Sequence, residues 1–392
     1  MVWDTVENRY GDDKVYDACG LFGVMDVTGE RFSGEGVVRA MSAMDERGNG
    51  LGSGYAVYGC YPDYADCYAF HVMYVDPDAR QQVEALLHQR FRWVHDEEVP
   101  HGSAAGLMNP PLIWRYFLRV PEDETEREES EESEYVVDVT MEINTSALGA
   151  YVYASGKNVG VFKGVGLPGP IAEYFDVASY EGYLWTAHNR FPTNTPGWWG
   201  GAHPFGLLDW TVVHNGEVSS YGANRRYLEM QGYHCTMQTD TEVMAYAADF
   251  LMRRHKLPVE VAAKVLAPPL WVEIDRMEPR ERRFYAALRQ VYSGLLVNGP
   301  FTIIVAREGE MVGLTDRIRL RPLTAAVGGS RLYLSSEEAP IRLIEPDLDR
   351  VWTPVGGHPV VGRLGERLPG SRTGAGQRSG QAQPAFSGER SV

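Results

Sequence analysis

The stretch from His188 to Glu242 reads HNRFPTNTPGWWGGAHPFGLLDWTVVHNGEVSSYGANRRYLEMQGYHCTMQTDTE, and the rest of the chain is interpreted outward from it. It holds three polar clusters: HNRF at 188–191, HNGE at 214–217 and TDTE at 239–242. Each cluster lies at the end of an apolar run or at the start of a helix-like pattern. A cation, an amide beside a glycine and a carboxylate could therefore converge on one small zwitterionic ligand. Covalent chemistry on such a ligand needs a nucleophile, for which Cys19 is the candidate.

Composition limits the class of protein. A chain of 392 residues is long enough for one large domain or two ordinary ones. Its net charge of -16 argues against a nucleic-acid or anionic-membrane surface as the main partner. No apolar run approaches the ~20 residues of a membrane-spanning helix, and residues 1–18 lack the apolar centre of a signal peptide. We therefore expect a soluble protein that acts on small molecules or meets other proteins.

The cysteines are four in number: Cys19, Cys60, Cys67 and Cys235. None belongs to a C-x-x-C pair, so the sequence indicates neither a zinc ribbon nor a cysteine-ligated iron–sulfur site. So low a density does not indicate a disulfide framework either, which fits a reducing cytoplasm. We predict a cytoplasmic protein in which all but Cys19 are ordinary thiols.

The hydrophobic patterns predict strands and helices that are segregated along the chain. Strands are predicted at 19–26, 54–59, 69–75, 136–143, 150–153, 159–162, 183–188, 301–307, 311–314 and 332–335. Helices are predicted at 35–47, 76–91, 239–254 and 279–295, and Thr239 with Glu242 forms a capping box for the third. This mixture favours an α+β layered architecture over a βαβ repeat.

Composition also divides the chain into three parts. Residues 1–18 are a leader, residues 19–366 are the folded domain, and residues 367–392 are a tail that we expect to be disordered because glycine, serine, glutamine and arginine dominate it. Within the domain, residues 122–134 are mostly acidic, with Arg127 as the single cation. We predict a solvated acidic loop there, with partner docking as the alternative.

Several motifs resemble those of the class II glutamine amidotransferases. CGLFG at 19–23 is similar to the amino-terminal motif of that family, and RGNG at 47–50 looks like its R-G segment. The series HNRFPTNTPGW, AHPF and HNGE, followed by TDTE, is especially similar to the glutaminase domain of glutamate synthases, including the N-methylglutamate synthase type. The ordered set runs from Cys19 to about residue 361, with enlarged segments between Tyr61 and Ala150.

The resemblance implies an N-terminal nucleophile (Ntn) hydrolase fold, which is a four-layer αββα sandwich. It also implies hydrolysis of glutamine to glutamate and ammonia, with Cys19 as the nucleophile that forms a thioester. The Asn215 side-chain amide and the Gly216 backbone N–H would stabilise the oxyanion. Arg190 would bind the α-carboxylate of glutamine, and Asp240 would bind its α-ammonium group.

Local interpretations of the same residues stay open. Asn215-Gly216 is also typical of a tight hairpin turn, and Asp240 is also placed to compensate a helix dipole. Thr193 is a further candidate for holding the substrate or its binding loop. Three histidines are the remaining polar residues of interest: His188, His203 and His214. Their spacing fits no standard metal-ligand motif, and the resemblance implies no metal. We therefore predict structural roles for them.

Cys19 departs from the simplest pattern of the family that it resembles. In that family the base is the nucleophile's own α-amino group, whose ordinary pKa of about 7.7–8.0 suits proton transfer. A peptide nitrogen has no available lone pair, so Cys19 must become residue one. Here it follows Ala18 rather than the initiator methionine. Some members of the family are made with a short propeptide, and that likeness supports cleavage between Ala18 and Cys19.

The resemblance also bears on partners, because a glutaminase domain of this class usually passes its ammonia to a second active site. No phosphoribosyl-pyrophosphate loop, sugar-phosphate isomerase repeat or long synthetase region follows the domain. We therefore predict a glutamate-synthase-like assembly whose partner subunits carry FMN and iron–sulfur clusters, with no cofactor in this chain. Two other hypotheses are a hydrolase of another amide and a non-catalytic regulatory or scaffold subunit that keeps its leader.

Overall fold

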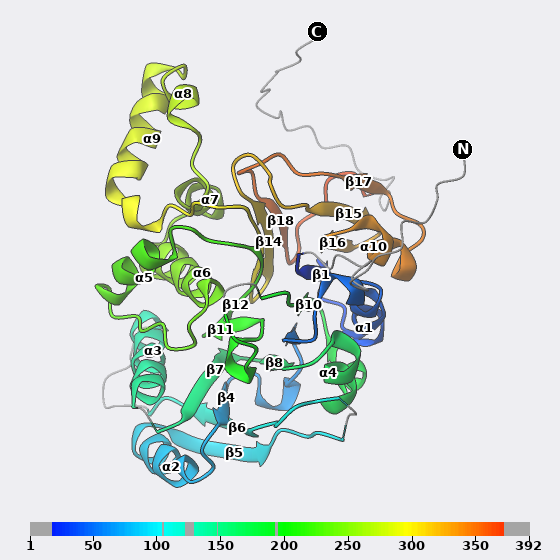
Figure 1. The fold of residues 1–392 in the computed structure, drawn as a ribbon, viewed down its shortest axis with the longest axis vertical. Helices are drawn as coiled ribbons and strands as arrows, with labels where there is room; N and C mark the ends of the chain where they lie inside the picture. The colour runs from blue at the N-terminus through cyan, green and yellow to red at the C-terminus, as the bar shows by residue number, and fades with distance from the viewer. Residues whose placement is uncertain (1–17, 104–105, 122–128, 147, 193–194, 372–392) are drawn as a thin grey trace, which may run out of the picture.

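The structure is a computed structural model, which describes residues 18–103, 106–121, 129–146, 148–192 and 195–371. Residues 1–17 and 372–392 lie outside the described residues, so the predictions about them stay predictions. Residues 367–371, which the sequence assigned to the disordered tail, are part of the fold instead, because Leu368 is buried in a hydrophobic cluster of the core. Two large antiparallel sheets stacked face to face form the centre of the fold (Figure 1).

The first large sheet has β1 at its centre, between β10 and β16. Its seven strands follow the order β17 (Arg350–Trp352), β15 (Thr324–Gly328), β16 (Arg331–Ser335), β1 (Gly20–Asp26), β10 (Leu184–Asn189), β3 (Ser53–Tyr58) and β8 (Val159–Gly164). Every residue of β1 is buried, as expected for a strand covered on both faces. The residue just before this central strand is Cys19.

The second large sheet lies against the first. Its five strands follow the order β11 (Phe205–Leu207), β12 (Trp210–Gly216), β13 (Phe301–Arg307), β14 (Glu310–Thr315) and β18 (Val360–Arg363). Leu21 of β1 belongs to the same buried cluster as Val213 of β12 and Ile304 of β13. Burying these apolar faces against each other is the main force that holds the two sheets together.

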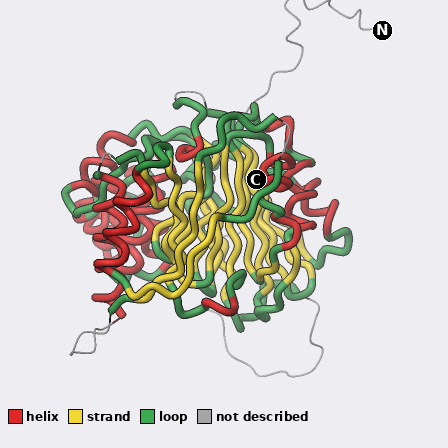
Figure 2. Tube along the Cα trace, turned by 90° about the horizontal axis from the view of Figure 1, so that it is seen from below, coloured by secondary structure: helices red, strands yellow, loops and turns green. Residues whose placement is uncertain are grey.

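Helices cover the outer faces of both sheets, so that strands lie in the middle and helices on either side (Figure 2). On the first sheet they are α1 (Glu35–Ser42), α4 (Pro168–Tyr174) and α10 (Glu338–Ile344). On the second they are α5 (Tyr221–Glu229), α6 (Asp240–Asp249) and α7 (Val259–Leu266), from which α8 (Trp271–Ile274) and α9 (Pro279–Val291) project. The predicted α+β sandwich of helix, sheet, sheet and helix is confirmed.

A smaller sheet accounts for the enlarged segment that the sequence indicated between Tyr61 and Ala150. Its strands follow the order β5 (Arg92–Glu98), β6 (Leu112–Arg119), β4 (Tyr68–Tyr74) and β7 (Ala150–Lys157), accompanied by the helices α2 (Ala79–Arg90) and α3 (Glu129–Thr145). β7 contacts β11 at the edge of the second large sheet. A two-stranded sheet pairs β2 (Phe32–Ser33) with β9 (Glu181–Gly182).

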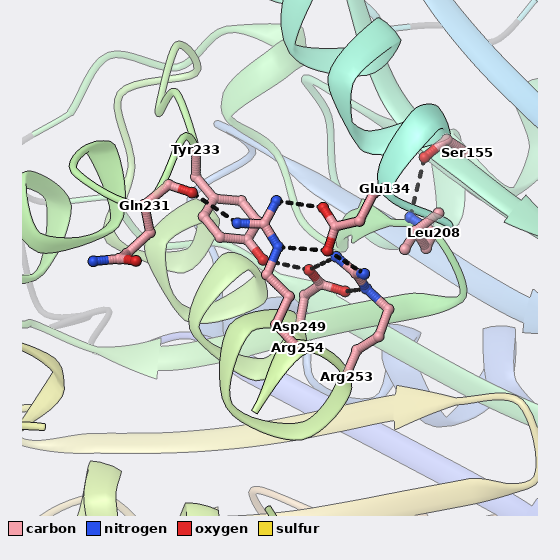
Figure 3. A network of polar contacts seen from close by, with 8 residues as sticks. All are labelled: Glu134, Ser155, Leu208, Gln231, Tyr233, Asp249, Arg253 and Arg254. Atoms are coloured by element: carbon pink, nitrogen blue, oxygen red, sulfur yellow. Dashed lines mark hydrogen bonds and ion pairs between the residues drawn. The ribbon is translucent and has the colours of Figure 1, made fainter. Parts of the chain in front are cut away.

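Helix α3 contradicts two predictions, a strand at 136–143 and a loop through residue 134. Val136, Val137, Thr140 and Met141 are buried, and their spacing defines one face of a helix. The run of β-branched residues favoured a strand, but packing against β7 decided otherwise. Glu134 is no solvated loop residue, because it forms ion pairs with Arg253 and Arg254 (Figure 3). The part of the acidic run at 122–128 lies outside the described residues.

The ends of several helices differ from those predicted from the sequence. The helix predicted at 35–47 ends at Ser42 and is followed by a 3₁₀ turn at Asp45–Arg47. The helix predicted at 239–254 ends in one turn of π-helix, Phe250–Arg254. Several other elements were not predicted from the sequence patterns, among them β5, β6, α7, β15 and α10. Within the parts of the chain that the structure describes, no helix is both long and apolar enough to cross a bilayer.

Candidate active site

The candidate nucleophile, Cys19, lies directly before β1 and lines a cavity. Cys19 is 8% exposed, and the strand that follows it pairs Gly20 with Asn189 of β10. The backbone N–H of Phe191 donates a hydrogen bond to Cys19 Sγ at 3.2 Å. Burial raises the pKa of the Cys19 thiol to about 11, and the Phe191 N–H opposes this shift only in part. The thiol is therefore protonated at neutral pH and needs a base to become a nucleophile.

The carbonyl oxygen of Cys19 is fixed from two sides. It accepts a hydrogen bond from Arg47 Nε at 3.1 Å and another from Asn215 Nδ2 at 2.8 Å. Arg47 is held in turn by an ion pair of 2.6 Å between its Nη1 and Glu337 Oε1. Residues from three distant parts of the chain thus orient the backbone of Cys19.

The glycine of the R-G segment, Gly48, is required for a steric reason. Asn189, at the end of β10, donates from Nδ2 to Met44 O at 2.9 Å. A Cβ added at Gly48 would lie 1.9 Å from Asn189 Oδ1. Only glycine fits there, so Gly48 allows the turn after α1 to pack on the end of β10, just before Arg190.

Arg190 is 4% exposed and lies in the same cavity as Cys19. Its guanidinium donates to Thr195 Oγ1 and to Pro196 O at 3.3 Å, both uncharged acceptors. Among the residues that the structure describes, no carboxylate lies within ion-pair distance of it. A buried guanidinium without an anionic partner is costly and is suited to bind the carboxylate of a ligand.

Asp240 supplies the opposite charge at the first turn of α6. Its Oδ1 is 3.3 Å from His214 Nδ1, and its Oδ2 accepts from the Val218 N–H at 3.2 Å. Burial alone would raise the pKa of Asp240, but His214, the Val218 N–H and Arg190 hold it below its ordinary value. The carboxylate is therefore ionised at neutral pH and can accept an ammonium group.

The predicted capping box at this helix forms only in part. Thr239 Oγ1 accepts from the Thr241 N–H at 3.1 Å, as a cap does. The Glu242 carboxylate accepts instead from the Thr236 N–H at 3.0 Å and the Met237 N–H at 2.9 Å. Glu242 thereby ties down the segment that precedes α6 and lines the cavity.

The oxyanion candidates lie at the end of β12. Gly216 lines the cavity at a φ of +151°, and a Cβ added there would lie 2.0 Å from Pro300 O. The interpretation of Asn215-Gly216 as a two-residue hairpin turn is wrong, because both residues belong to β12 and pair with β13. The Asn215 amide is bonded to Cys19 O in this structure, so its oxyanion role stays a prediction.

A cavity of about 310 Å³ brings these groups together. It has room for an amino acid with a short polar side chain, and its lining residues are Cys19, Arg190, Phe191, Pro192, Thr195, His203, His214, Gly216, Glu217, Val218, Tyr221, Gln238, Thr239 and Asp240. A larger cavity of about 720 Å³ lies beside α3 and the π-helical turn, and no cysteine lines it. Thr193, the remaining site candidate, lies outside the described residues.

The three histidines form a buried cluster at the wall of the cavity, which His203 and His214 line. His188 Nε2 donates to His214 O at 2.8 Å, and the His188 and His203 rings stack at 4.1 Å. His203 Nε2 is 2.9 Å from Thr241 Oγ1. Burial lowers the pKa of His188 to about 3 and that of His203 well below its ordinary value. Both are thus neutral, and no group of metal-ligating side chains able to hold an ion occurs in the described parts of the chain.

Sequence reasoning missed the groups that hold the site rather than act in it. They include the Phe191 N–H on Cys19, the pair Arg47–Glu337, and the Val218 N–H on Asp240. A backbone N–H carries no signal in a sequence. Arg47 and Glu337 lie 290 positions apart, so no local pattern links them.

Comparison with known proteins identifies the family of this chain. Residues 74–348 match the family model described as class II glutamine amidotransferases. An uncharacterized protein of Archaeoglobus fulgidus is 58% identical over 358 residues, which are 91% of this chain and 94% of that protein. A putative glutamine amidotransferase of Methanothermobacter thermautotrophicus is 25% identical over 330 residues, 83% of this chain and 93% of that protein.

A third relative is much longer than this chain. The glutamate synthase [NADPH] large chain of Bacillus subtilis is 23% identical over 262 residues. These residues are 60% of this chain but 17% of that one. The likeness is therefore confined to one part of the longer protein.

Proposed function

The chain belongs to the class II glutamine amidotransferases, and from this membership we propose how it releases ammonia from L-glutamine and to what kind of partner it passes it. One observation carries the proposal. The Cys19 cavity places the buried guanidinium of Arg190, which has no carboxylate partner among the described residues, and an ionised carboxylate, Asp240, beside a thiol. These are the complements of an α-carboxylate, an α-ammonium group and a side-chain amide carbon.

The first step of the proposed route makes the base. Hydrolysis of the Ala18–Cys19 peptide bond consumes one water molecule, leaving a carboxyl group on Ala18 and a free α-amino group on Cys19. That amine accepts the proton of Cys19 Sγ. Since burial holds the thiol protonated at neutral pH, the nucleophile is generated only when the amine takes this proton.

The thiolate then attacks the amide carbon of glutamine. The amine returns its proton to the leaving nitrogen, the C–N bond breaks, and ammonia departs from a thioester on Cys19. Water hydrolyses the thioester, which gives glutamate and restores the thiol. Asn215 Nδ2 and the Gly216 N–H are the proposed oxyanion donors, and one such donor is worth about 3–4 kcal/mol in the transition state. Asn215 must exchange or share its bond to Cys19 O to take this role.

The test is intact-mass analysis of the purified protein together with a glutamate-release assay. We expect a mature chain that begins at Cys19 and loses activity in Cys19→Ala. A chain that retains Met1 and is fully active would overturn the N-terminal-amine route. A chain that retains Met1 and is inactive would favour a regulatory subunit, and hydrolysis of other amides in preference to glutamine would favour a different hydrolase.

For the ammonia acceptor we propose partner subunits of glutamate-synthase type that carry FMN and iron–sulfur clusters. The support is the likeness to the Bacillus subtilis glutamate synthase large chain, of which this chain matches only a part. Cys19, Cys60, Cys67 and Cys235 are all free, and no cluster of ligating side chains occurs among the described residues. Purification of this chain from the source cells should also yield a flavoprotein, and the complex should use glutamine as the source of ammonia for its product. Free copies of this chain alone would count against the assembly.

A further inference from the structure

Each of the three buried histidines at the wall of the Cys19 cavity has one ring nitrogen without a hydrogen-bond partner among the described residues. These atoms are His188 Nδ1, His203 Nδ1 and His214 Nε2. The three residues are 0%, 4% and 2% exposed. A buried polar atom without a partner destabilises the fold, and an apolar side chain of similar size would avoid that loss. Packing alone therefore does not explain why histidines occupy these positions.

The other ring nitrogen of His214 lies against the carboxylate that we propose to bind the α-ammonium group of glutamine. His214 Nδ1 is 3.3 Å from Asp240 Oδ1. Because an ionised carboxylate only accepts hydrogen bonds, Nδ1 carries the proton in this contact. Asp240 Oδ2 accepts from the Val218 N–H at 3.2 Å. Each carboxylate oxygen is thus held by one donor from β12 or the segment directly after it, and each keeps a further lone pair for a ligand.

These two contacts direct the Asp240 side chain into the cavity. Asp240 is the first residue of α6, where a carboxylate can also accept from the free backbone N–H groups of its own helix. Thr239 Oγ1 accepts from one of these groups, the Thr241 N–H. Asp240 accepts instead from Val218, outside the helix, and lines the cavity together with Arg190.

A closed ring of contacts fixes His214 itself. His188 Nε2 donates to His214 O at 2.8 Å, and the His188 ring stacks on that of His203 with the ring centres 4.1 Å apart. His203 Nε2 is 2.9 Å from Thr241 Oγ1, which is 3.3 Å from His214 Nδ1. Thr241 directly follows Asp240 in the chain. The ring of contacts therefore joins the strand that carries His214 to the helical turn that carries Asp240.

We propose that His214 is a positioning residue, which holds the Asp240 carboxylate through its Nδ1–H and thereby selects amides that are also α-amino acids. His188, His203 and Thr241 hold His214 in turn. His214 contacts neither the amide carbon nor the thiol; it acts through Asp240. The inference rests on the proposed function in taking glutamine as the ligand, and it deepens that function by assigning a residue that sets the substrate class.

The direct test measures binding to the full chain carrying Cys19→Ala, so that a bound amide is not turned over. Isothermal titration calorimetry compares L-glutamine with glutaramate, which has hydrogen in place of the α-ammonium group. We expect tighter binding of glutamine, and a preference that falls by about tenfold or more in His214→Leu, because a charge-assisted hydrogen bond to Asp240 is lost. His214→Asn, whose amide keeps a donor near the place of Nδ1, should restore most of the preference. The matched control is His71→Leu, which removes a buried histidine of the small sheet and should leave the preference unchanged.

A double-mutant cycle shows whether His214 acts through Asp240. Asp240→Asn alone should lower the preference for glutamine, and the addition of His214→Leu should lower it little further. Equal loss of affinity for both ligands in His214→Leu would mean that the histidine only links β12 to α6, and would overturn the proposal. Independent losses in the double variant would overturn it as well, and so would a Cys19→Ala protein that does not prefer glutamine.

Hydrolysis of glutamine by the same variants with Cys19 restored separates this inference from the proposed function. His214→Leu should raise KM and change kcat little, since the ammonium contact is made equally in the ground state and the transition state. A chain that prefers glutamine in the binding test but hydrolyses none would overturn the proposed activity and support the ammonium site. A lower kcat at an unchanged KM in His214→Leu would overturn the positioning role.

Discussion

Two clusters of charged side chains, one partly buried and one buried, use the same residue types in opposite ways. In the staple, which comprises Glu134, Tyr233, Asp249, Arg253 and Arg254, each charge meets its opposite (Figure 3). In the Cys19 cavity, the acceptors that Arg190 finds among the described residues are uncharged, namely Thr195 Oγ1 and Pro196 O. The staple ties α3 to the end of α6, and the cavity lies at the other end of α6. Helix α6 thus has a cluster of paired charges at its C-terminal end. At its N-terminal end lies the cavity, where Arg190 is available to bind a ligand.

The difference has an energetic meaning. A buried ion pair contributes little net stability, but removing one partner leaves an unpaired charge and costs several kcal/mol. A buried charge left unpaired in the native protein carries that cost permanently, and the cost is recovered only when a ligand of opposite charge binds. Unpaired buried charge therefore marks the functional cluster, and paired buried charge marks the structural one.

The largest expected effect is at the nucleophile. Cys19→Ala should lower kcat for glutamine hydrolysis by about 10⁴-fold or more, because the covalent route is lost entirely. Glutamate release under saturating glutamine measures it. Cys67→Ala, a buried free thiol outside the cavity, should leave kcat near its original value. Comparable activity in the two variants would mean that Cys19 is not the nucleophile.

Substitutions of Arg190 test whether its charge serves to bind glutamine. Arg190→Met should lower kcat/KM for glutamine by about 10²-fold or more, since a buried charge-assisted pair is lost. Its free energy of unfolding should stay the same or rise, because a costly buried cation is removed. Arg190→Lys should recover only part of the activity, as lysine lacks the planar fork. An unchanged KM with a large loss of stability would place Arg190 among the structural residues.

Arg253 should show the opposite pattern. Arg253→Met leaves the fully buried Asp249 with one charged partner fewer, and it should lower the free energy of unfolding by about 3 kcal/mol. Glutamine kcat/KM, corrected for the folded fraction, should hardly change. Urea unfolding and a glutamate-release assay measure the two quantities. The control is Arg225→Met, whose pair with Glu229 lies at the surface and should cost less than about 1 kcal/mol.

The two clusters also differ in how far sequence could predict them. The candidate catalytic and binding residues of the cavity occur in short motifs that follow apolar runs or begin a helix. Their convergence was therefore predictable. The structure brings Cys19, Arg190, Gly216 and Asp240 into one cavity. The hydrophobic patterns predicted an α+β layered architecture, and the four-layer sandwich was predictable only through the family resemblance that the ordered motifs carry.

The staple was not predictable, for a physical reason. Glu134 forms an ion pair with Arg253 across 119 positions, whereas the acidic residues around Glu134 predict a solvated loop. The helix that carries it owes its shape to packing on β7 rather than to intrinsic propensity, which favours strand for its valines. Tertiary packing decided there, and a single sequence does not reveal it.

The smallest expected effect concerns a second buried cation near the cavity, Lys163. It is 1% exposed, its Nζ donates to Gly200 O at 3.1 Å, and burial lowers its pKa to about 7. In the unfolded chain the same amine titrates near 10.5. Between these two values the unfolded state holds one proton more than the folded state, so this residue makes stability rise with pH across that window.

Lys163→Met removes this linkage and the cost of burying the amine. At pH 7 the variant should be more stable than the original protein by roughly 1–3 kcal/mol, and the gap should close as the pH approaches 10. Urea unfolding at both pH values measures it. The control is Lys157→Met, whose amine pairs with Glu132 nearer the surface and should shift stability by less than about 1 kcal/mol. A Lys163→Met protein less stable than the original at pH 7 would show that the bond to Gly200 outweighs desolvation, and unpaired burial would then no longer distinguish the cavity from the staple.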